Sequence, residues 1–309
     1  MLKKSALKKI FISLSCLAIM GIIYLFPDKN DTIKSSISNT NIDNNVIYLM
    51  DDNNYIARVS TILTSKKTED KIREIISILT IGSDKYIRNG FSKLIPKNTK
   101  ILSISIEDSL LKINFSKELL NIDLKNEEKM IESIVYSLTS LDNIKYVSIY
   151  VEGNILDKLP NSKRRLNTVL DRKIGINKEF NINDINNTTK TTIYYLSKYD
   201  NYYYYVPVTK ISNEDISKIE VIIRELSGNK ILGTNLISYL NSNTELLSYN
   251  ETDKTLLLNF NESILNDITT NNILEEVTYS INLSIKDNYD VSEVFYYVND
   301  KIVNTFSIN

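Results

Sequence analysis

The spacing of apolar residues along this chain predicts a series of strands and helices. In the first half, apolar runs predict strands, and isoleucine and leucine at positions i, i+3, i+4 and i+7 predict helices. The expected order is strand, helix, hairpin, helix and strand, over 46–49, 72–79, 101–106 with 110–115, 130–141 and 147–151. This order predicts a small α+β domain in which two helices cover one face of a short sheet.

The second half shows the same order of patterns. Its expected strands and helices lie over 193–196, 202–208, 216–226, 246–249 with 256–260, 273–281 and 294–298. Ser212 with Asp215 resembles the capping box that begins a helix, and Gly228 suits a C-terminal cap.

A direct repeat links the two halves, because residues 94–116 and 239–261 align without a gap. Identical residues at matching positions include Asn98 and Asn243, Leu102 and Leu247, Asp108 and Asp253, Asn114 and Asn259, and Phe115 and Phe260. A repeat of about 145 residues is the size of a domain rather than of a solenoid unit. We therefore expect two related domains in tandem, over 46–160 and 191–309.

The segment between them, 161–190, is polar and predicts a linker in which Phe180 and its neighbours could dock. Its basic start, Lys163 to Arg165, could touch anionic lipid or cell wall. We expect a solvated stretch instead.

The N-terminal segment 1–27 predicts export or membrane attachment. Four lysines precede an apolar run from Ile10 to Phe26, and this order favours a cytoplasmic N-terminus with the rest of the chain outside. The run has about the minimum length of a spanning helix, which favours an uncleaved single-span anchor. Residues 28–45 are polar and predict a flexible tether.

Two other interpretations of this segment stay open. Cys16 could be the lipid acceptor of a lipoprotein, with Ser15 suitable before it, although Ser13 stands where leucine is usual. The segment could also be a cleaved signal peptide, although no clear A-x-A site is visible.

Composition excludes several classes of chemistry. The 309 residues include no histidine, no tryptophan and one cysteine, which removes the commonest general base, an intrachain disulfide and a Cys/His zinc site. The formal net charge is −1 with lysines spread among acids, so nucleic-acid binding is not expected. Glycine-rich phosphate loops are also absent, so we expect no cofactor and no metal.

Paired carboxylates are the remaining candidates for catalysis, since a hydrolase acting on peptidoglycan could use two of them. The adjacent pairs are Asp51 with Asp52, Glu127 with Glu128 and Glu275 with Glu276. Neighbours on a helix point in different directions, so solvated helix faces explain the last two pairs better. We therefore expect no catalytic residues and no enzyme.

A run of four tyrosines, Tyr202 to Tyr205, could stack on sugars. In a strand two rings would point to each face, with one set against the core. Because aromatic residues favour strands in general, we expect packing rather than a binding platform.

Both halves resemble the GerMN domain of GerM-type sporulation and spore-germination proteins. The first copy carries the pattern L-x-P-x-x-T-x-x-L followed by I-N-F-S, at Leu94, Pro96, Thr99, Leu102, Asn114, Phe115 and Ser116. Its later stretch SIVYSLTSLDNIKYVSIYVEG matches the helix, strand and Glu-Gly turn of that family. The second copy diverges, with Asn241 in place of the proline and Asn299–Asp300 in place of the Glu-Gly turn.

This resemblance implies an extracytoplasmic, membrane-tethered protein of a spore-forming bacterium. It implies a fold similar to the ring-building domains of secretion machineries. It also implies a role in assembling or positioning the channel complex between mother cell and forespore, and an effect on germination. Expected partners are the membrane, other envelope channel proteins and a possible second copy of the chain.

Overall fold

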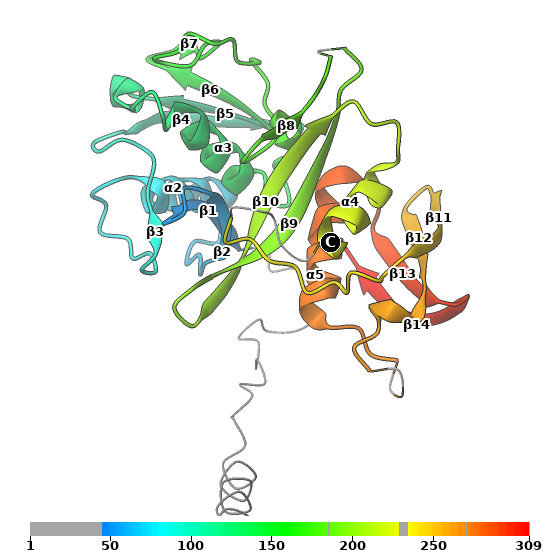
Figure 1. Cartoon of the computed structure of the whole chain (residues 1–309). Coiled ribbons are helices and arrows are strands. Elements are labelled where there is room, and N and C mark those ends of the chain that lie inside the picture. The colour runs from blue at the N-terminus through cyan, green and yellow to red at the C-terminus, as the bar shows by residue number, and fades with distance from the viewer. Residues whose placement is uncertain (1–44, 185, 229–233, 268, 270, 309) are drawn as a thin grey trace, which may run out of the picture. The chain divides into compact units, whose positions relative to one another are not determined.

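A computed structural model describes residues 45–308, apart from 185, 229–233, 268 and 270 (Figure 1). The apolar run Ile10 to Phe26, and Cys16 within it, therefore lie outside the described residues. Among the described residues, no helix has the length and apolar content needed to cross a membrane.

The first domain has the predicted order of elements with extra short strands. They are β1 (Val46–Asp51), β2 (Ile56–Ser60), α2 (Thr68–Leu79), β3 (Phe91–Ser92), β4 (Ile101–Glu107), β5 (Leu110–Phe115), α3 (Glu127–Leu138), β6 (Tyr146–Val151) and β7 (Asn154–Ile155). Strands β4 to β7 form one sheet in chain order, in which β5 and β6 run parallel and α3 is the crossover between them. Alternation along β5 buries Leu111, Ile113 and Phe115 completely.

The second domain repeats this plan. Its elements are β9 (Thr189–Tyr199), β10 (Tyr202–Ser212), α4 (Lys218–Ser227), β11 (Leu246–Thr252), β12 (Thr255–Phe260), α5 (Glu275–Asn288), β13 (Glu293–Val298) and β14 (Lys301–Ser307). Strands β11 to β14 form the matching sheet, with α5 crossing between the parallel β12 and β13. The expected tandem α+β class is thus present. The expectation of one sheet per domain is wrong, because the first strands of each half lie in a separate sheet with β3 and β8 (Glu179–Asn181).

The turn after the last core strand shows how the divergent copy keeps the geometry. In the first domain, Asn114 Oδ1 accepts a hydrogen bond from the N–H of Gly153 at 3.0 Å. In the second, Asn259 Oδ1 accepts one from the N–H of Asp300 at 3.1 Å. Both turns have positive φ at two successive residues, which asparagine and aspartate tolerate better than most residues. The asparagine of the family pattern is therefore a structural residue.

The two domains share a sheet. The hairpins β1–β2 and β9–β10 meet side by side, because β2 pairs antiparallel with β10 through Arg58 and Tyr205 (Figure 1). The side chain of Asn177 joins them further, accepting from the N–H of Ile56 and donating to the carbonyls of Ile56 and Pro207 at 2.7 to 2.8 Å. The shared sheet therefore joins the two domains directly.

The tyrosine run packs as expected, but on both faces of its strand rather than on one. Tyr204 and Tyr205 are 3% and 4% exposed, although they point to opposite faces of β10. Tyr204 packs edge-on against Phe91 with ring centroids 4.9 Å apart, and Tyr205 stacks on Tyr279 of α5. Strand β10 lies between the two domains, so both of its faces are covered. Tyr204 and Tyr205 are therefore both buried, although they lie on opposite faces.

Two other sequence expectations differ from the structure. The capping box lies at Ser217 and Glu220, since β10 continues through Ser212 and the helix begins later. Strands β2 and β14 were not expected from the sequence. Neither shows alternation of apolar residues, because β2 is buried on both faces and β14 is mostly exposed.

A loop of the first domain also packs closely against the second domain. Gly90 has φ +85°, and a Cβ atom there would lie 2.4 Å from the ring of Tyr199 at the end of β9. Glycine is needed at this position both for its backbone conformation and for the close approach of the tyrosine ring.

Gly90→Ala is expected to lower the free energy of unfolding by about 1–2 kcal/mol for the left-handed backbone and about 1–3 kcal/mol more for overpacking. The matched control is Gly153→Ala, with φ +80° and no atom within 4 Å of the added Cβ. Urea denaturation of both variants measures the difference. Equal losses would show that the contact with Tyr199 contributes nothing.

Candidate functional site

Serines at equivalent positions of α3 and α5 form hydrogen bonds with the first strand of each hairpin. The N–H of Tyr48 in β1 donates to Ser137 Oγ of α3 at 2.8 Å, and the N–H of Tyr194 in β9 donates to Ser284 Oγ of α5 at 2.9 Å. Ser133 Oγ also donates to the carbonyl of Tyr48. These bonds satisfy backbone groups that would otherwise be buried without partners, and they make Tyr48 and Tyr194 equivalent residues of the repeat.

These equivalent tyrosines meet at the domain contact. The hydroxyl oxygens of Tyr48 and Tyr194 lie 3.0 Å apart, and both side chains are 1% exposed. Contact between equivalent residues is the property of a two-fold arrangement, as in a symmetric dimer. The tandem domains are therefore packed like two copies of one unit related by an approximate two-fold axis.

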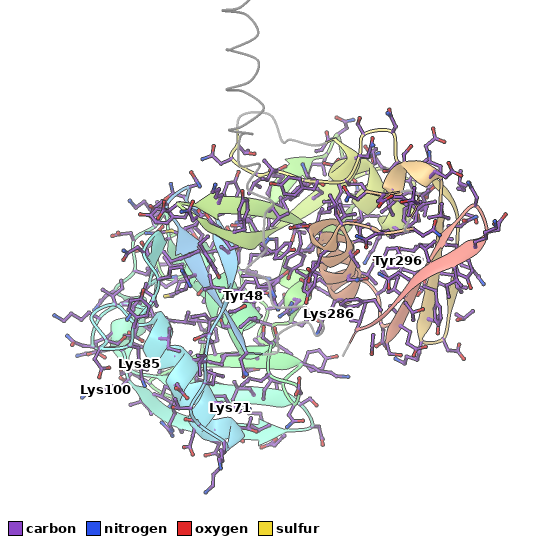
Figure 2. All side chains as sticks on the ribbon, turned by 90° about the horizontal axis from the view of Figure 1, so that it is seen from below. Tyr48, Lys71, Lys85, Lys100, Lys286 and Tyr296 are labelled. Carbon is purple, nitrogen blue, oxygen red and sulfur yellow. The ribbon has the colours of Figure 1, made fainter. Side chains whose placement is uncertain are left out.

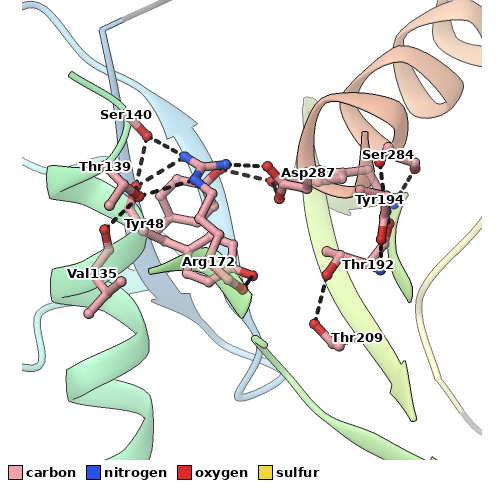
Figure 3. Close-up of polar contacts among 12 residues, drawn as sticks. Tyr48, Val135, Thr139, Ser140, Arg172, Thr192, Tyr194, Thr209, Ser284 and Asp287 are labelled. Atoms are coloured by element: carbon pink, nitrogen blue, oxygen red, sulfur yellow. Dashed lines mark hydrogen bonds and ion pairs between the residues drawn. The ribbon is translucent and has the colours of Figure 1, made fainter. Parts of the chain in front are cut away.

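Arg172, from the segment between the domains, lies at this contact (Figure 3). Its guanidinium donates hydrogen bonds from all three nitrogens. The acceptors are Thr139 Oγ1, Tyr48 Oη, Asp287 Oδ1, the carbonyl of Tyr136 and Ser140 Oγ, at 2.5 to 3.4 Å. The five N–H groups of arginine are thus matched by five acceptors from both domains.

Asp287, near the end of α5, is the charged partner. Its carboxylate lies 2.5 Å from Arg172 Nη1 and accepts from the hydroxyl of Tyr194 at 2.6 Å, with its side chain 2% exposed. Burial alone would lower the pKa of Arg172, but Asp287 and the neighbouring tyrosines outweigh it and raise that pKa well above its ordinary value. Burial and Asp287 likewise raise the pKa of Tyr194, so its hydroxyl remains a donor.

A second polar contact between the domains involves one of the candidate carboxylates. Asp51 ends β1, is 2% exposed, and accepts from the N–H groups of Asn53 and Tyr55 and from the hydroxyl of Tyr204. Burial raises the pKa of Asp51 more than these hydrogen bonds lower it. Asp51 thus holds a turn and a domain contact, while its neighbour Asp52 is exposed.

The pair Glu127 and Glu128 is not a solvated helix face. Glu127 is 2% exposed and accepts from the N–H groups of Asn161 and Ser162. Glu128 pairs with Arg164 at 2.5 Å and with Lys178 at 2.8 Å. Both carboxylates at the start of α3 therefore fix the segment between the domains.

That segment is structured over most of its length. The basic stretch Lys163 to Arg165 is exposed, although Arg164 forms an ion pair with Glu128. Lys178 pairs with Glu128 and also with the buried Glu132. Strand β8 (Glu179–Asn181) pairs in parallel with the end of β10. Phe180 within it is 66% exposed, so its backbone docks and its ring does not.

A cavity of about 590 Å³ opens at the domain contact. Its lining residues include Tyr48, Tyr194, Arg58 and Lys286, together with residues 139–142, which follow α3. In Figure 2 the labelled Tyr48 and Lys286 lie near each other between the two domains. No sequence pattern indicates this cavity, because its lining comes from segments far apart in the chain.

The other predicted site residues do not come together there. Glu275 and Glu276 begin α5, and Cys16 lies outside the described residues. Within the described part of the chain, no group of three or more acidic or cysteine side chains is placed to hold a metal ion. The fold and the contact define a pair of like α+β domains packed together through a buried polar network.

Comparison with known proteins identifies the family. Residues 46–157 and 192–303 match the family described as Germane: Sporulation and spore germination. The chain is 30% identical over 281 residues to the spore germination protein GerM of Bacillus subtilis (strain 168), covering 89% of this chain and 76% of that protein. The chain therefore belongs to the Germane family.

A solved structure agrees with this assignment. The tandem GerMN domains of the sporulation protein GerM from Bacillus subtilis are similar at a TM-score of 0.77 and 27% identity, over 85% of this chain and 96% of that one. The predicted resemblance of both halves to GerMN domains is confirmed.

Arg172→Met is expected to lower the free energy of unfolding by about 3–5 kcal/mol, because it leaves the carboxylate of Asp287 buried without its cation. Adding Asp287→Leu should recover part of the loss. Lys254→Met, which breaks the exposed pair with Asp290, is the control and should have a much smaller effect. Urea denaturation measures all three, and similar losses for Arg172→Met and the control would contradict the role of the buried pair.

Glu127→Gln is expected to reduce the dependence of stability on pH. Burial would raise the pKa of Glu127, but hydrogen bonds from Ser162 and Asn161 outweigh it and hold that pKa below its ordinary value of 4.5. Its contribution to stability is therefore present above pH 4.5 and lost as the pH falls through the folded-state pKa. Denaturation of wild type and variant at a series of acidic pH values tests this, and identical profiles would refute it.

Proposed function

We propose that this chain is a non-enzymatic, membrane-tethered protein outside the cytoplasm that helps to assemble or localise an envelope channel or ring complex between mother cell and forespore. Its partners are the membrane, through the N-terminal segment, and other channel proteins. The observation that carries the proposal is the match of both domains to a sporulation and germination family, over nearly the whole described chain.

The arrangement of the domains supports a scaffolding role. The buried network around Arg172 and the shared sheet hold two like domains together. The sheets β4–β7 and β11–β14 are not used in the shared sheet, so their outer edges are available for contacts. Strand β4 and strands β11 and β14 are these edges, and their residues are mostly exposed. An exposed edge can pair with a strand of another protein.

Equivalent leucines mark two of these edges. Leu102 is 47% exposed and Leu247 is 50% exposed, and each lies at an irregularity in the pairing of its strand. Both occupy the same place in the repeat and one belongs to the family pattern. Apolar side chains exposed at matching points favour contact with other proteins.

Two other functions are less well supported. A sugar-binding platform on the tyrosine run is disfavoured because Tyr204 and Tyr205 are buried. A carboxylate-based hydrolase is disfavoured because Asp51, Glu127 and Glu128 are engaged in contacts that hold turns and the interdomain segment.

The first test is a strain that lacks this chain, with a fluorescently tagged copy restored. Loss of spore yield or of engulfment, with the tag at the engulfing membrane, is expected. Normal sporulation with an even envelope distribution would exclude the proposed role. The double variant Glu127→Gln with Glu128→Gln should sporulate normally where its melting curve matches that of wild type, a check needed because both carboxylates hold the interdomain segment. A strong defect at wild-type stability would favour the hydrolase.

Leu102→Asp with Leu247→Asp is expected to abolish localisation of the tagged protein without lowering its thermal stability, because both side chains are exposed. Leu124→Asp is the matched control, since Leu124 is 63% exposed in a loop away from the sheet edges. Microscopy in sporulating cells and a melting curve give the two readouts. Normal localisation of the double variant would show that these edges are not the contact surface.

A further inference from the structure

The loop that leads into β3 contains Asn89 followed by Gly90, which is the one Asn–Gly pair in the sequence (Figure 1). Asparagine is among the thermolabile residues of proteins. In an Asn–Gly pair the backbone nitrogen of the glycine can attack the side-chain amide carbon of the asparagine, because glycine has no Cβ to hinder the approach. The pair is therefore open to spontaneous modification wherever the fold leaves its reacting groups unbonded.

Both reacting groups are unbonded. Within the part of the chain that the structure describes, the exposed side-chain amide of Asn89 forms no hydrogen bond, and the N–H of Gly90 has no acceptor. A bonded amide would first have to break its hydrogen bond before it could react, which adds to the barrier. No such cost protects Asn89.

A second exposed asparagine before a small residue shows the opposite arrangement. Asn161 Nδ2 donates to the carbonyl of Ile122 at 2.7 Å, and the N–H of Ser162 donates to Glu127 Oε1 at 3.1 Å. Both groups that would have to react are therefore held by other residues. The fold protects this pair and leaves Asn89 open, although both asparagines are exposed.

Turn geometry does not explain the asparagine. Asparagine is favoured in turns where φ is positive or where its side chain bonds the nearby backbone. Asn89 does not have a positive φ, and its side chain bonds no backbone group among the described residues. The backbone of Gly90 and its contact with Tyr199 explain the glycine, but they do not require asparagine before it.

The position of the pair makes a change there consequential. A Cβ at Gly90 would lie 2.4 Å from the ring of Tyr199, and Arg88 Cζ lies 4.1 Å from the centroid of the Tyr202 ring. The residues on both sides of Asn89 thus contact the hairpin β9–β10 of the second domain. Because close-packed groups accommodate an added methylene only by shifting, a longer backbone at Asn89 would disturb both contacts.

We propose that Asn89 deamidates spontaneously and that the product weakens the contact between the two domains as the protein ages. The nitrogen of Gly90 forms a bond to Cγ of Asn89, and the side-chain nitrogen leaves as ammonia with the proton of the Gly90 N–H. This closes a cyclic succinimide. The site is independent of the proposed role in channel assembly.

Hydrolysis of the succinimide gives the products. Water adds to either ring carbonyl and breaks its bond to the nitrogen of Gly90. Opening at Cγ gives aspartate, and opening at the main-chain carbonyl gives iso-aspartate, in which the main chain passes through Cβ and Cγ. Iso-aspartate therefore adds one carbon to the backbone beside the contact with Tyr199, together with a carboxylate.

The test is an ageing experiment on the full chain in nonionic detergent at mildly alkaline pH, with a parallel sample unfolded in urea. Trypsin cleaves after lysine and arginine, so it releases the two asparagines in peptides of equal length, 89–93 and 159–163. Chromatography with mass spectrometry separates the asparagine, aspartate and iso-aspartate forms. A digest at zero time gives the background that arises during digestion.

Folding is expected to slow deamidation of Asn161 at least about tenfold more than that of Asn89, which corresponds to about 1.4 kcal/mol of activation free energy. Comparing the folded with the unfolded chain at each site removes the intrinsic difference between Asn–Gly and Asn–Ser. Equal protection of the two sites, or no product at Asn89 in the folded chain, would overturn the proposal.

The effect on the domain contact is measured by urea denaturation of fresh and aged samples. Aged wild type should unfold at a lower urea concentration than fresh wild type. Asn89→Ser lacks the side-chain carbonyl needed for the ring, so it is the matched control and should keep its midpoint. An unchanged midpoint of aged wild type, or an equal loss in Asn89→Ser, would refute the weakening.

Fresh Asn89→Asp separates the charge from the added backbone carbon. It places a carboxylate at an exposed position without lengthening the chain, so it should denature like fresh wild type. A loss as large as that of the aged protein would contradict the role of the longer backbone.

Discussion

The ion pair between Arg172 and Asp287 is the interaction on which the tandem arrangement depends. Two like domains approach each other at equivalent tyrosines, and the carboxylate of Asp287 is buried at that contact. Arg172 lies outside the repeat and donates hydrogen bonds to both domains at once, including one to Asp287. Such a pair adds little net stability on its own, but removing one partner is costly. It therefore specifies how the domains pack.

The segment between the domains is consequently part of the structure. It supplies Arg172, the side chain of Asn177 between β2 and β10, and the parallel strand β8. Its own position is fixed by Glu127 and Glu128 at the start of α3. The segment thus provides asymmetric contacts that two separate copies of the domain would lack. These contacts hold the two domains, and with them their outer sheet edges, in one relative position.

Family membership and the architecture of the two domains both agree with the proposed scaffolding role. The residues that carry the family pattern, such as Asn114 and Thr99, hold turns through hydrogen bonds to the backbone. Leu102 differs from them because it is exposed in the first domain and matched by Leu247 in the second. A family pattern that is mostly structural, with an exposed apolar residue at one position, is compatible with the proposed contacts with other proteins.

The sequence by itself determined the repeat, the order of helices and most strands, and the α+β class, because local periodicity and turn residues depend on near neighbours in the chain. Tertiary structure alone decided the shared sheet, the burial of Tyr204 and Tyr205 on opposite faces, and the roles of Arg172 and Glu127. These depend on partners about 30 to 150 residues away. Glu127, for example, is predicted from the sequence to lie on a solvated helix face, but long-range contacts bury it. Periodicity does not encode such contacts.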